Sequence, residues 1–207
     1  MWLSIVIGLL TGYLLGNLNG AVCISTLMQD DVRSHGSGNA GLTNFIRNYG
    51  NTKALYVVAV DALKAVLSCL VTGFLLAPYG YYTEGVMLGG AAVMLGHVFP
   101  VLLGFRGGKG ILSGLFIAIV ADWRIALLIA AVFFTVYFLT RYVSLSSVLA
   151  AACFGIGFCL LHGSNVVVTV CGLFMSVLTI YMHRSNIQRL LKGQESKTDL
   201  FSKEKKS

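Results

Sequence analysis

The stretch ALYVVAVDALKAVLSCLVTGFLL, residues 54–76, decides the fold class. Asp61 and Lys64 are its only charged residues, and about 20 mainly apolar residues are enough to carry a helix across a bilayer. Six further apolar runs accompany it, at residues 2–28, 85–103, 111–121, 125–140, 143–161 and 166–182. We therefore predict an all-α, polytopic integral membrane protein with seven transmembrane helices.

The composition of the 207-residue chain supports this prediction. It is 57% hydrophobic and 11% charged, whereas an average soluble domain is about 25% charged. Such a chain cannot cover a water-facing surface, which excludes a soluble globular enzyme, a disordered chain and a secreted disulfide scaffold. The five cysteines lie in apolar runs without metal-ligand spacing, and we expect neither a metal nor a cofactor. One membrane domain is expected over residues 1–207, with residues 192–207 as a basic, solvated cytoplasmic tail outside the site.

The positions of the cations predict the orientation. The net charge is +7, and we interpret it as membrane topology and not as nucleic-acid binding. With seven spans and the N-terminus outside, thirteen of the fifteen Lys and Arg residues lie on the cytoplasmic side, Arg124 lies outside and Lys64 lies within a span. This is the positive-inside pattern, and it places the C-terminus in the cytoplasm. The run 111–121 makes only about 17 Å of helix, so five spans with two re-entrant segments and the same termini remain the main alternative.

The segment GSGNAGLTN, residues 36–44, with Arg47 after it, is the first candidate site. Its glycines allow backbone N–H groups to approach a ligand closely, and the planar guanidinium matches phosphate. A flexible connection between two spans is the alternative. The candidate anion-binding residues here are Gly36, Ser37, Gly38, Asn39, Gly41, Thr43, Asn44 and Arg47.

The segments GHVFP, residues 96–100, and FRGGKG, residues 105–110, form the second candidate site. The glycines again expose N–H groups, the lysine is a point charge, and a predicted helix begins directly afterwards, so its positive dipole end adds to the site. A structural role is the alternative for the histidine. The candidate residues are His97, Arg106, Gly107, Gly108, Lys109 and Gly110.

Three further features carry polar groups near or within the spans. Ser144 lies at the start of a predicted helix, where a plain N-cap is the alternative to binding. His183 and Asn186 share one helical face at the end of the last span, where basic residues also anchor helices to lipid headgroups. Asp61 and Lys64 are either functional or an internal ion pair, because charges at this depth are costly.

Together these segments resemble the bacterial acyl-phosphate:glycerol-3-phosphate acyltransferase family of the PlsY type. Residues 37–47 look like its first motif, residues 96–110 like its second, residues 144–147 like a looser third, and residues 183–195 like its H-x-x-N-I-x-R-L…G-x-E ending. Leu42 and Ala65 depart from the family pattern, which has Ala and Gly there. The anion-binding groups themselves are all present.

The resemblance implies an acyl-phosphate-dependent glycerol-3-phosphate 1-O-acyltransferase. Such an enzyme moves a fatty acyl group from acyl phosphate to the 1-hydroxyl of glycerol 3-phosphate and forms lysophosphatidic acid in phospholipid synthesis. It implies a multi-pass protein of the bacterial cytoplasmic (inner) membrane. Its partners would be the two substrates, the lipid bilayer and a soluble phosphate acyltransferase that supplies acyl phosphate. Catalytic roles are expected for Ser37, Arg47, Lys109, His183 and Asn186, and substrate contacts for Lys64, Ser144 and the other motif residues.

Two questions stay open at this stage. The proton of the attacking hydroxyl goes either to a substrate phosphate or to His97 or His183 as general base. A transporter for phosphate-bearing organic anions would use the same inner cations, with Asp61 and Lys64 in its pathway. The polar motifs gather at one face without a matching outer set, which favours the enzyme.

Overall fold

The computed structural model describes residues 1–200, and within them every regular element is helical. The elements are α1 (Trp2–Gly16), α2 (Gly20–Leu27), η1 (Val32–Ser34), α3 (Leu42–Tyr49), α4 (Asn51–Leu76), η2 (Ala77–Tyr79), α5 (Tyr82–Val98), η3 (Val101–Leu103), α6 (Ile111–Ala121), α7 (Trp123–Thr140), α8 (Val143–His162), α9 (Val166–Met182) and α10 (Arg184–Leu191). The all-α prediction is confirmed.

The predicted spans correspond to these helices with differences in length. Within residues 1–200, four segments are long and apolar enough to cross a membrane: Asn51–Tyr79, Tyr82–Leu103, Trp123–Thr140 and Val143–His162. The pair α1 and α2 is bent by 44° and the pair α9 and α10 by 54°, which gives up to six spans if each bent pair crosses as one. The helix α6 is apolar but has only 11 residues.

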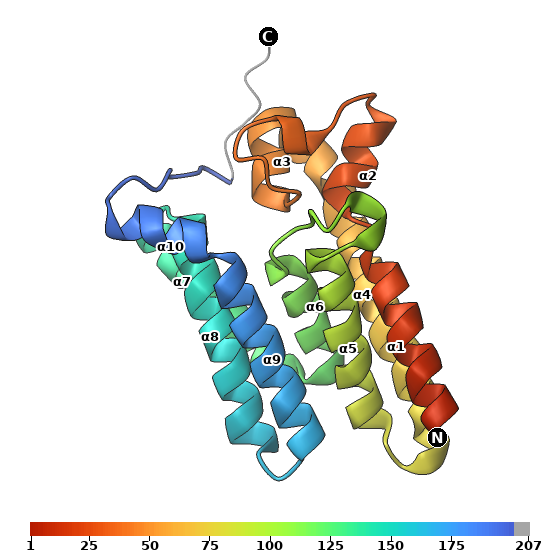
Figure 1. The fold of residues 1–207 in the computed structure, drawn as a ribbon. Coiled ribbons are helices and arrows are strands. Elements are labelled where there is room, and N and C mark those ends of the chain that lie inside the picture. The colour runs from red at the N-terminus through yellow and green to blue at the C-terminus, as the bar shows by residue number, and fades with distance from the viewer. Residues whose placement is uncertain (201–207) are drawn as a thin grey trace.

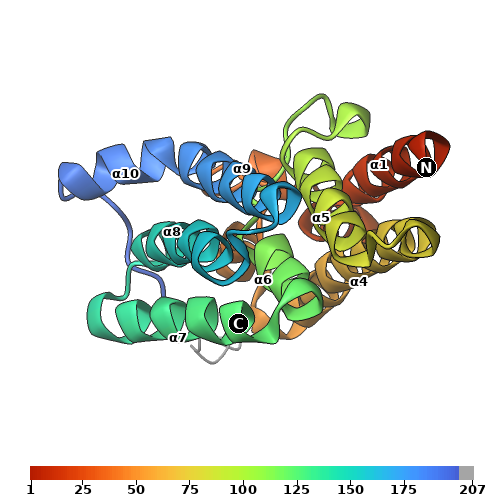
Figure 2. The same ribbon diagram turned by 90° about the horizontal axis from the view of Figure 1, so that it is seen from below.

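The helices form two groups with α6 between them. The helices α1, α4 and α5 pack together on one side, α7, α8 and α9 pack together on the other, and α6 contacts members of both (Figure 2). The core that joins them is apolar and includes Val93, Met94, Ile117, Phe158 and Met175. The N-terminus lies at the opposite end of the bundle from α2, α3 and α10 (Figure 1).

The first apolar run is broken, although the sequence predicts one continuous span over residues 2–28. The chain leaves the helix at Asn17 and starts a new one at Gly20. The Asn19 side chain accepts a hydrogen bond from the Val22 N–H at 3.0 Å and so caps α2. An asparagine in an apolar run is therefore a helix start here, because the amide satisfies a backbone donor that the break exposes.

Small residues let α1 approach its neighbours closely. Gly8, Gly12 and Gly16 recur at every fourth position of α1 and are all buried. A Cβ at Gly96 of α5 would overlap the carbonyl oxygen of Tyr13. Such close backbone contact through small residues is a usual way for membrane helices to associate.

We expect Gly96→Ala to lower the stability of the protein by about 1–3 kcal/mol, because the added methyl group must displace the backbone of α1. Gly114→Ala is the matched control, since its Cβ would meet only the flexible Met94 Cε at 3.4 Å. Thermal unfolding in detergent measures both variants. Equal unfolding temperatures would contradict the close packing of α1 on α5.

Candidate active site

The first glycine-rich loop is folded around the Asn44 side chain. Its Nδ2 donates to the carbonyl oxygens of Val32 at 2.9 Å, His35 at 3.1 Å and Asn39 at 3.1 Å. Its Oδ1 accepts from the Ser37 N–H at 3.0 Å. The Asn44 amide thus shapes the loop, and the Ser37 side chain lies exposed on it.

Glycines allow the chain to turn at both motifs. Gly36 and Gly38 have φ values of +56° and +69°, and Gly110 has +88° at the start of α6. These are left-handed conformations that other residues adopt at a steric cost. Gly41 lies in extended backbone at the start of α3 instead, where a Cβ would approach the Asn39 side chain at 2.6 Å.

A buried cluster of Asp61, Lys64 and His97 supports both loops from below. The Lys64 ammonium lies 2.7 Å from Asp61 Oδ1, 2.8 Å from the Leu18 carbonyl and 2.7 Å from His97 Nδ1. An ammonium group has three donors, so these three acceptors use all of them. The His97 Nδ1 must accept, which leaves the ring proton on Nε2. Of the two interpretations of Asp61 and Lys64, the geometry favours the internal ion pair.

This cluster connects directly to the motifs. Asp61 Oδ1 accepts from the Gly20 N–H at 3.2 Å, and Asn19 Nδ2 donates to the Ala40 carbonyl at 2.9 Å. On the other side, the Gly108 N–H donates to the His97 carbonyl at 3.1 Å, and a Cβ at Gly108 would overlap the His97 ring. A Cβ at Gly107 would overlap the same carbonyl. Lys64 and His97, predicted to contact substrate, thus hold the loops that carry the other candidates.

A second polar cluster joins residues that are distant in the sequence. The Lys109 ammonium donates to Asn186 Oδ1. Asn186 Nδ2 donates to Glu195 Oε1 at 2.7 Å, and Arg189 Nε donates to Glu195 Oε2 at 2.6 Å. Arg47 lies close enough for its charge to act on Lys109. The structure therefore brings Arg47 of α3, Lys109 before α6 and Asn186 of α10 close together. We call these three residues, together with Arg189 and Glu195, the cation cluster.

The cation cluster carries more positive than negative charge. Burial, together with the positive charges of Arg189 and Arg47, lowers the pKa of Lys109 to about 8, although Glu195 acts in the opposite direction. Burial would raise the pKa of Glu195, but the hydrogen bonds from Asn186 and Arg189 contribute to lowering the pKa overall. One carboxylate thus faces three cations, and the surplus positive charge suits an anion.

The remaining candidates differ in their surroundings. His183 is buried, and its Nδ1 lies 2.8 Å from the Thr179 carbonyl, which can only accept, so Nε2 is left unprotonated. The charges of Lys109 and Glu195 act on this ring. Ser144 lies in the first turn of α8, whose N-cap is Tyr142, so the serine is not the cap. Within residues 1–200, Thr43 and Arg106 make no side-chain hydrogen bond or ion pair.

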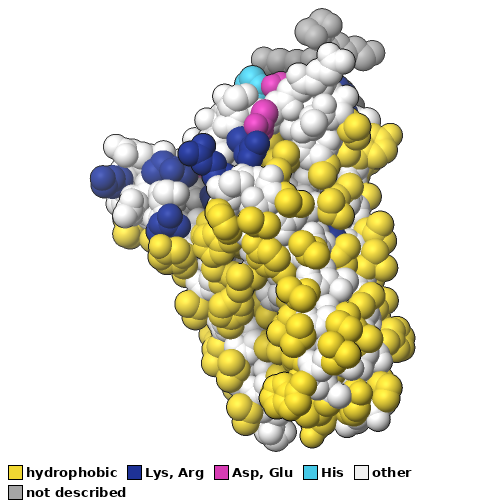
Figure 3. Space-filling model, turned by 45° about the vertical axis from the view of Figure 1, so that its right-hand side comes forward, with side chains coloured by type: hydrophobic (Ala, Val, Ile, Leu, Met, Phe, Trp, Pro, Cys, Tyr) yellow, Lys and Arg dark blue, Asp and Glu magenta, His cyan; other side chains and the backbone are white. Residues whose placement is uncertain are grey.

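The helix starts at this end of the bundle are open to a ligand. The helices α4, α6 and α8 begin there without a side-chain cap. At the opposite end, Asp122 caps α7 and Asn165 caps α9, whereas α1 and α5 begin there without a side-chain cap. Uncapped N-termini leave N–H donors and the positive dipole end for an anion. Lys and Arg side chains also gather towards this end on the face shown in Figure 3, above a surface of hydrophobic side chains.

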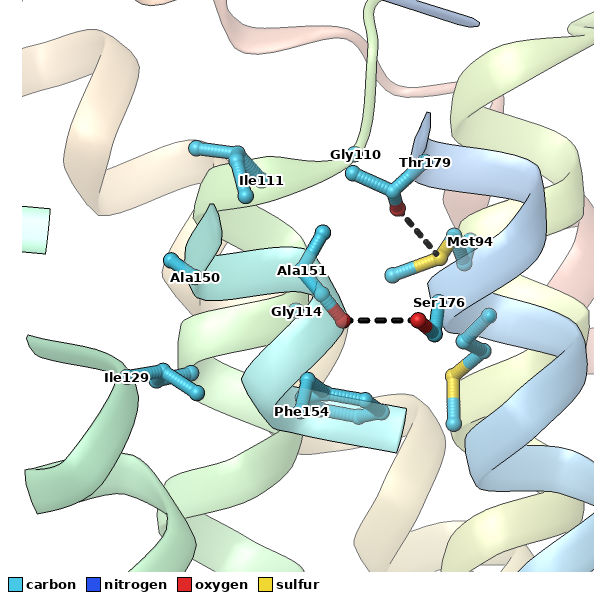
Figure 4. Close-up of a pocket in the computed structure, with 11 residues that line it drawn as sticks. Met94, Gly110, Ile111, Gly114, Ile129, Ala150, Ala151, Phe154, Ser176 and Thr179 are labelled. Atoms are coloured by element: carbon cyan, nitrogen blue, oxygen red, sulfur yellow. Dashed lines mark hydrogen bonds between the residues drawn. The ribbon is translucent and has the colours of Figure 1, made fainter. Parts of the chain in front are cut away.

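A narrow cavity lies beneath Gly110, between α5, α6, α7, α8 and α9 (Figure 4). Its volume is about 20 Å³, which is room for about one water molecule. The Ser176 hydroxyl donates to the Ala151 carbonyl at 2.7 Å, and the Thr179 hydroxyl contacts Met94 Sδ at 3.6 Å. The polar groups of the lining thus bond within the protein, and the interior beneath Gly110 is mainly apolar and narrow.

Part of this site lies after residue 191, where the sequence does not predict it. We expected a solvated tail after residue 191, but Thr198 is buried and contacts Arg47, and Glu195 is part of the cation cluster. Composition could not show this, because the segment is rich in charged and small polar residues. The signal that could have found Glu195 is its place at the end of the segment 183–195, which resembles the family's ending. Residues 201–207 of the predicted tail lie outside the described residues.

Apolar helices with a basic, glycine-lined site at one end define a membrane protein that binds an anion at the membrane boundary. Residues 6–193 match the family model described as "Glycerol-3-phosphate acyltransferase". The chain therefore belongs to the glycerol-3-phosphate acyltransferase family, and the resemblance inferred from its motifs is confirmed.

Relatives and solved structures agree with this assignment. The glycerol-3-phosphate acyltransferase of Thermoanaerobacter sp. (strain X514) is 37% identical over 193 residues, which cover 93% of this chain and 94% of that protein. That of Staphylococcus carnosus (strain TM300) is 35% identical over 201 residues, covering 94% and 98%. A crystal structure of PlsY (YgiH), an integral membrane glycerol 3-phosphate acyltransferase, in its glycerol 3-phosphate form, is 32% identical with a TM-score of 0.85. The match covers 96% of this chain and 100% of that one. The protein is a multi-pass membrane protein.

We expect Lys64→Met to destabilise the protein by about 3–5 kcal/mol, because it leaves Asp61 as an uncompensated buried charge. Lys53→Met, at an exposed position of the same helix, is the control and should unfold like the unchanged protein. Unfolding temperatures in detergent measure the difference. If both variants unfold alike, the Asp61–Lys64 pair does not hold the helices together.

Proposed function

We propose that the protein transfers a fatty acyl group from acyl phosphate to the 1-hydroxyl of glycerol 3-phosphate and so forms lysophosphatidic acid. The observation that carries this proposal is the convergence of Arg47, Lys109, Asn186 and Arg189 from three separate stretches of the chain. Both substrates carry phosphate, and one adds an apolar chain. A surplus of fixed cations at the end of an apolar bundle is matched to that pair. The family membership gives the reaction class.

We propose seven membrane segments, with the N-terminus outside and the C-terminus in the cytoplasm of a bacterial inner membrane. The fourth segment would be α6, which is short because the Gly110 turn and Asp122 end it on both sides. The N-terminus lies at the other end of the bundle from the cation cluster. The positive-inside rule then assigns the cluster to the cytoplasmic side, where a soluble phosphate acyltransferase could deliver acyl phosphate.

Arg47 and Lys109 would neutralise the phosphate of the acyl donor, while the backbone of residues 36–43 and the Ser37 hydroxyl add neutral donors. Asn186 and His183 would hold glycerol 3-phosphate. An acyl phosphate is already activated, so the protein mainly has to position the hydroxyl oxygen against the carbonyl carbon. The new ester bond forms as the bond to phosphate breaks, and phosphate departs with its electron pair.

The proton of the hydroxyl goes to a substrate phosphate or to a histidine. Of the two histidines, His97 already accepts from Lys64 at Nδ1, whereas His183 Nε2 is available as an acceptor. The choice is thus between the phosphate and His183. An anion transporter is less well supported, because Asp61 and Lys64, which its pathway would use, are buried and paired with each other.

The donor is tested by offering glycerol 3-phosphate with acyl phosphate, acyl-CoA or acyl-carrier protein to the purified protein in liposomes. We expect 1-acyl-glycerol 3-phosphate from acyl phosphate only. Arg47→Ala and Asn186→Ala should each lower kcat/KM by about 100-fold or more, as expected for lost contacts to a charged group. Uptake of glycerol 3-phosphate without acylated product would instead establish a transporter.

The pH dependence follows from Lys109. Its pKa of about 8 means that the ammonium is charged below pH 8 and neutral above it. We therefore expect kcat/KM to fall as the pH rises through about 8 in the free enzyme. Lys109→Arg should move this alkaline limb to higher pH, because arginine stays charged. An unchanged limb in that variant would assign the titration to another group.

A further inference from the structure

The chain after α10 turns back across the end of the bundle. Residues 195–200, which we call the C-terminal strap, pass from Glu195 beside α10 to Leu200 beside α7. The family model matches residues 6–193 and so ends before the strap begins. Its first residue, Glu195, lies in the segment 183–195 that resembles the family's ending, and residues 196–200 follow that segment.

The far end of the strap is held by α7 and the residue that follows it. The Tyr137 hydroxyl donates to the Thr198 carbonyl at 3.1 Å and accepts from the Leu200 N–H at 2.8 Å. The Thr198 N–H donates to the Arg141 carbonyl at 3.1 Å. Tyr137 is fully buried and Thr198 is 6% exposed. Both backbone polar groups of Thr198 are thus bound by the bundle, which fixes the place of this residue in the strap.

That side chain points to Arg47. Arg47 Nε donates to Thr198 Oγ1 at 3.1 Å, and Nη2 donates to the same oxygen. The Ser196 carbonyl lies 3.5 Å from Nη2. One edge of the guanidinium is therefore bound by neutral oxygens of the strap, while the Nη1 group adds further donors on the other edge.

Arg47 differs in its acceptors from three other arginines of residues 1–200. Arg33 pairs with Asp31, Arg124 with Asp122 and Arg189 with Glu195, so a carboxylate compensates the charge of each. A hydroxyl and a carbonyl orient Arg47 instead, and neither cancels its charge. An oriented but uncompensated guanidinium retains its full attraction for phosphate.

We propose that Thr198 is a positioning residue for the acyl transfer: its hydroxyl fixes the Arg47 guanidinium with the charge intact and the remaining donors ready for substrate phosphate. This inference rests on the proposed function, in which Arg47 binds that phosphate. The strap thereby links α3 to α7 across the cation cluster.

Thr198→Val tests the inference, because it keeps the shape of the side chain and removes the acceptor. We expect kcat/KM for acyl phosphate to fall about tenfold, as for one lost hydrogen bond to a charged group, mainly through KM. Thr198→Ser restores the hydroxyl and should return the value to within about twofold. Tyr137→Phe should change kcat/KM in the same direction as Thr198→Val, because it releases the strap. Lys197→Ala, at an exposed strap position, should behave like the unchanged enzyme.

A double-mutant cycle separates this inference from the proposed function. A lysine at position 47 has one nitrogen and cannot bind the Thr198 hydroxyl through two. Adding Thr198→Val to Arg47→Lys should therefore lower kcat/KM little further. If Thr198→Val has an unchanged or higher kcat/KM while Arg47→Lys is impaired, the positioning role alone is overturned. A higher value would also mean that the strap competes with phosphate for Arg47. Full activity of Arg47→Lys would instead overturn the role of Arg47 in the proposed function.

Discussion

The rest of the site depends on the contacts that the Lys64 ammonium makes with Asp61, His97 and the Leu18 carbonyl. In a bilayer, a backbone group that loses its helical partner must find another within the protein. The break between α1 and α2 frees the Leu18 carbonyl, and Lys64 binds it while it also binds Asp61 and His97. Because Asp61 further accepts from Gly20, one buried ion pair makes a broken helix stable inside the bundle. Both glycine motifs are then placed by this break, the first through Asn19 and Ala40 and the second through the His97 carbonyl.

The proposed catalytic residues come from two parts of the chain, one before α7 and one after α9. Arg47 and Lys109 belong to the part of the chain that precedes α7, whereas Asn186, Arg189 and Glu195 follow α9. The contacts Lys109–Asn186 and Arg47–Thr198 connect the two groups directly. Substrate phosphate bound by groups from both sides would strengthen the same connection. Such a site is well suited to bring two phosphate-bearing molecules together, because each group of helices can hold one of them.

How far the sequence predicts this arrangement depends on the range of each interaction. The apolar runs predict the long helices because burial or lipid contact applies at every residue of a span, and the glycine motifs indicate their turns because positive φ values are a local property. The break at Asn17–Asn19 is not predicted, since a polar residue in an apolar run is equally compatible with a contact between helices. The place of Thr198 could not be predicted either, because its partners Tyr137 and Arg47 lie 61 and 151 residues away. The sequence leaves Asp61 and Lys64 open between a functional role and an internal ion pair, and the geometry shows the pair together with a carbonyl and a ring nitrogen as further partners of Lys64.

The single carboxylate of the cation cluster, Glu195, partly offsets the effect of its positive charges on Lys109. Without Glu195, Lys109 would face Arg189 and Arg47 with no compensation and would lose its proton more readily. A second carboxylate would neutralise the cluster and compete with phosphate. With one carboxylate, Lys109 is mostly protonated near neutral pH, but its pKa of about 8 lies only a little above that pH. An arriving phosphate favours the charged form of a nearby lysine, so substrate binding itself would complete the charge of the site. The cluster would thus be most fully charged when the substrate that needs the charge is bound.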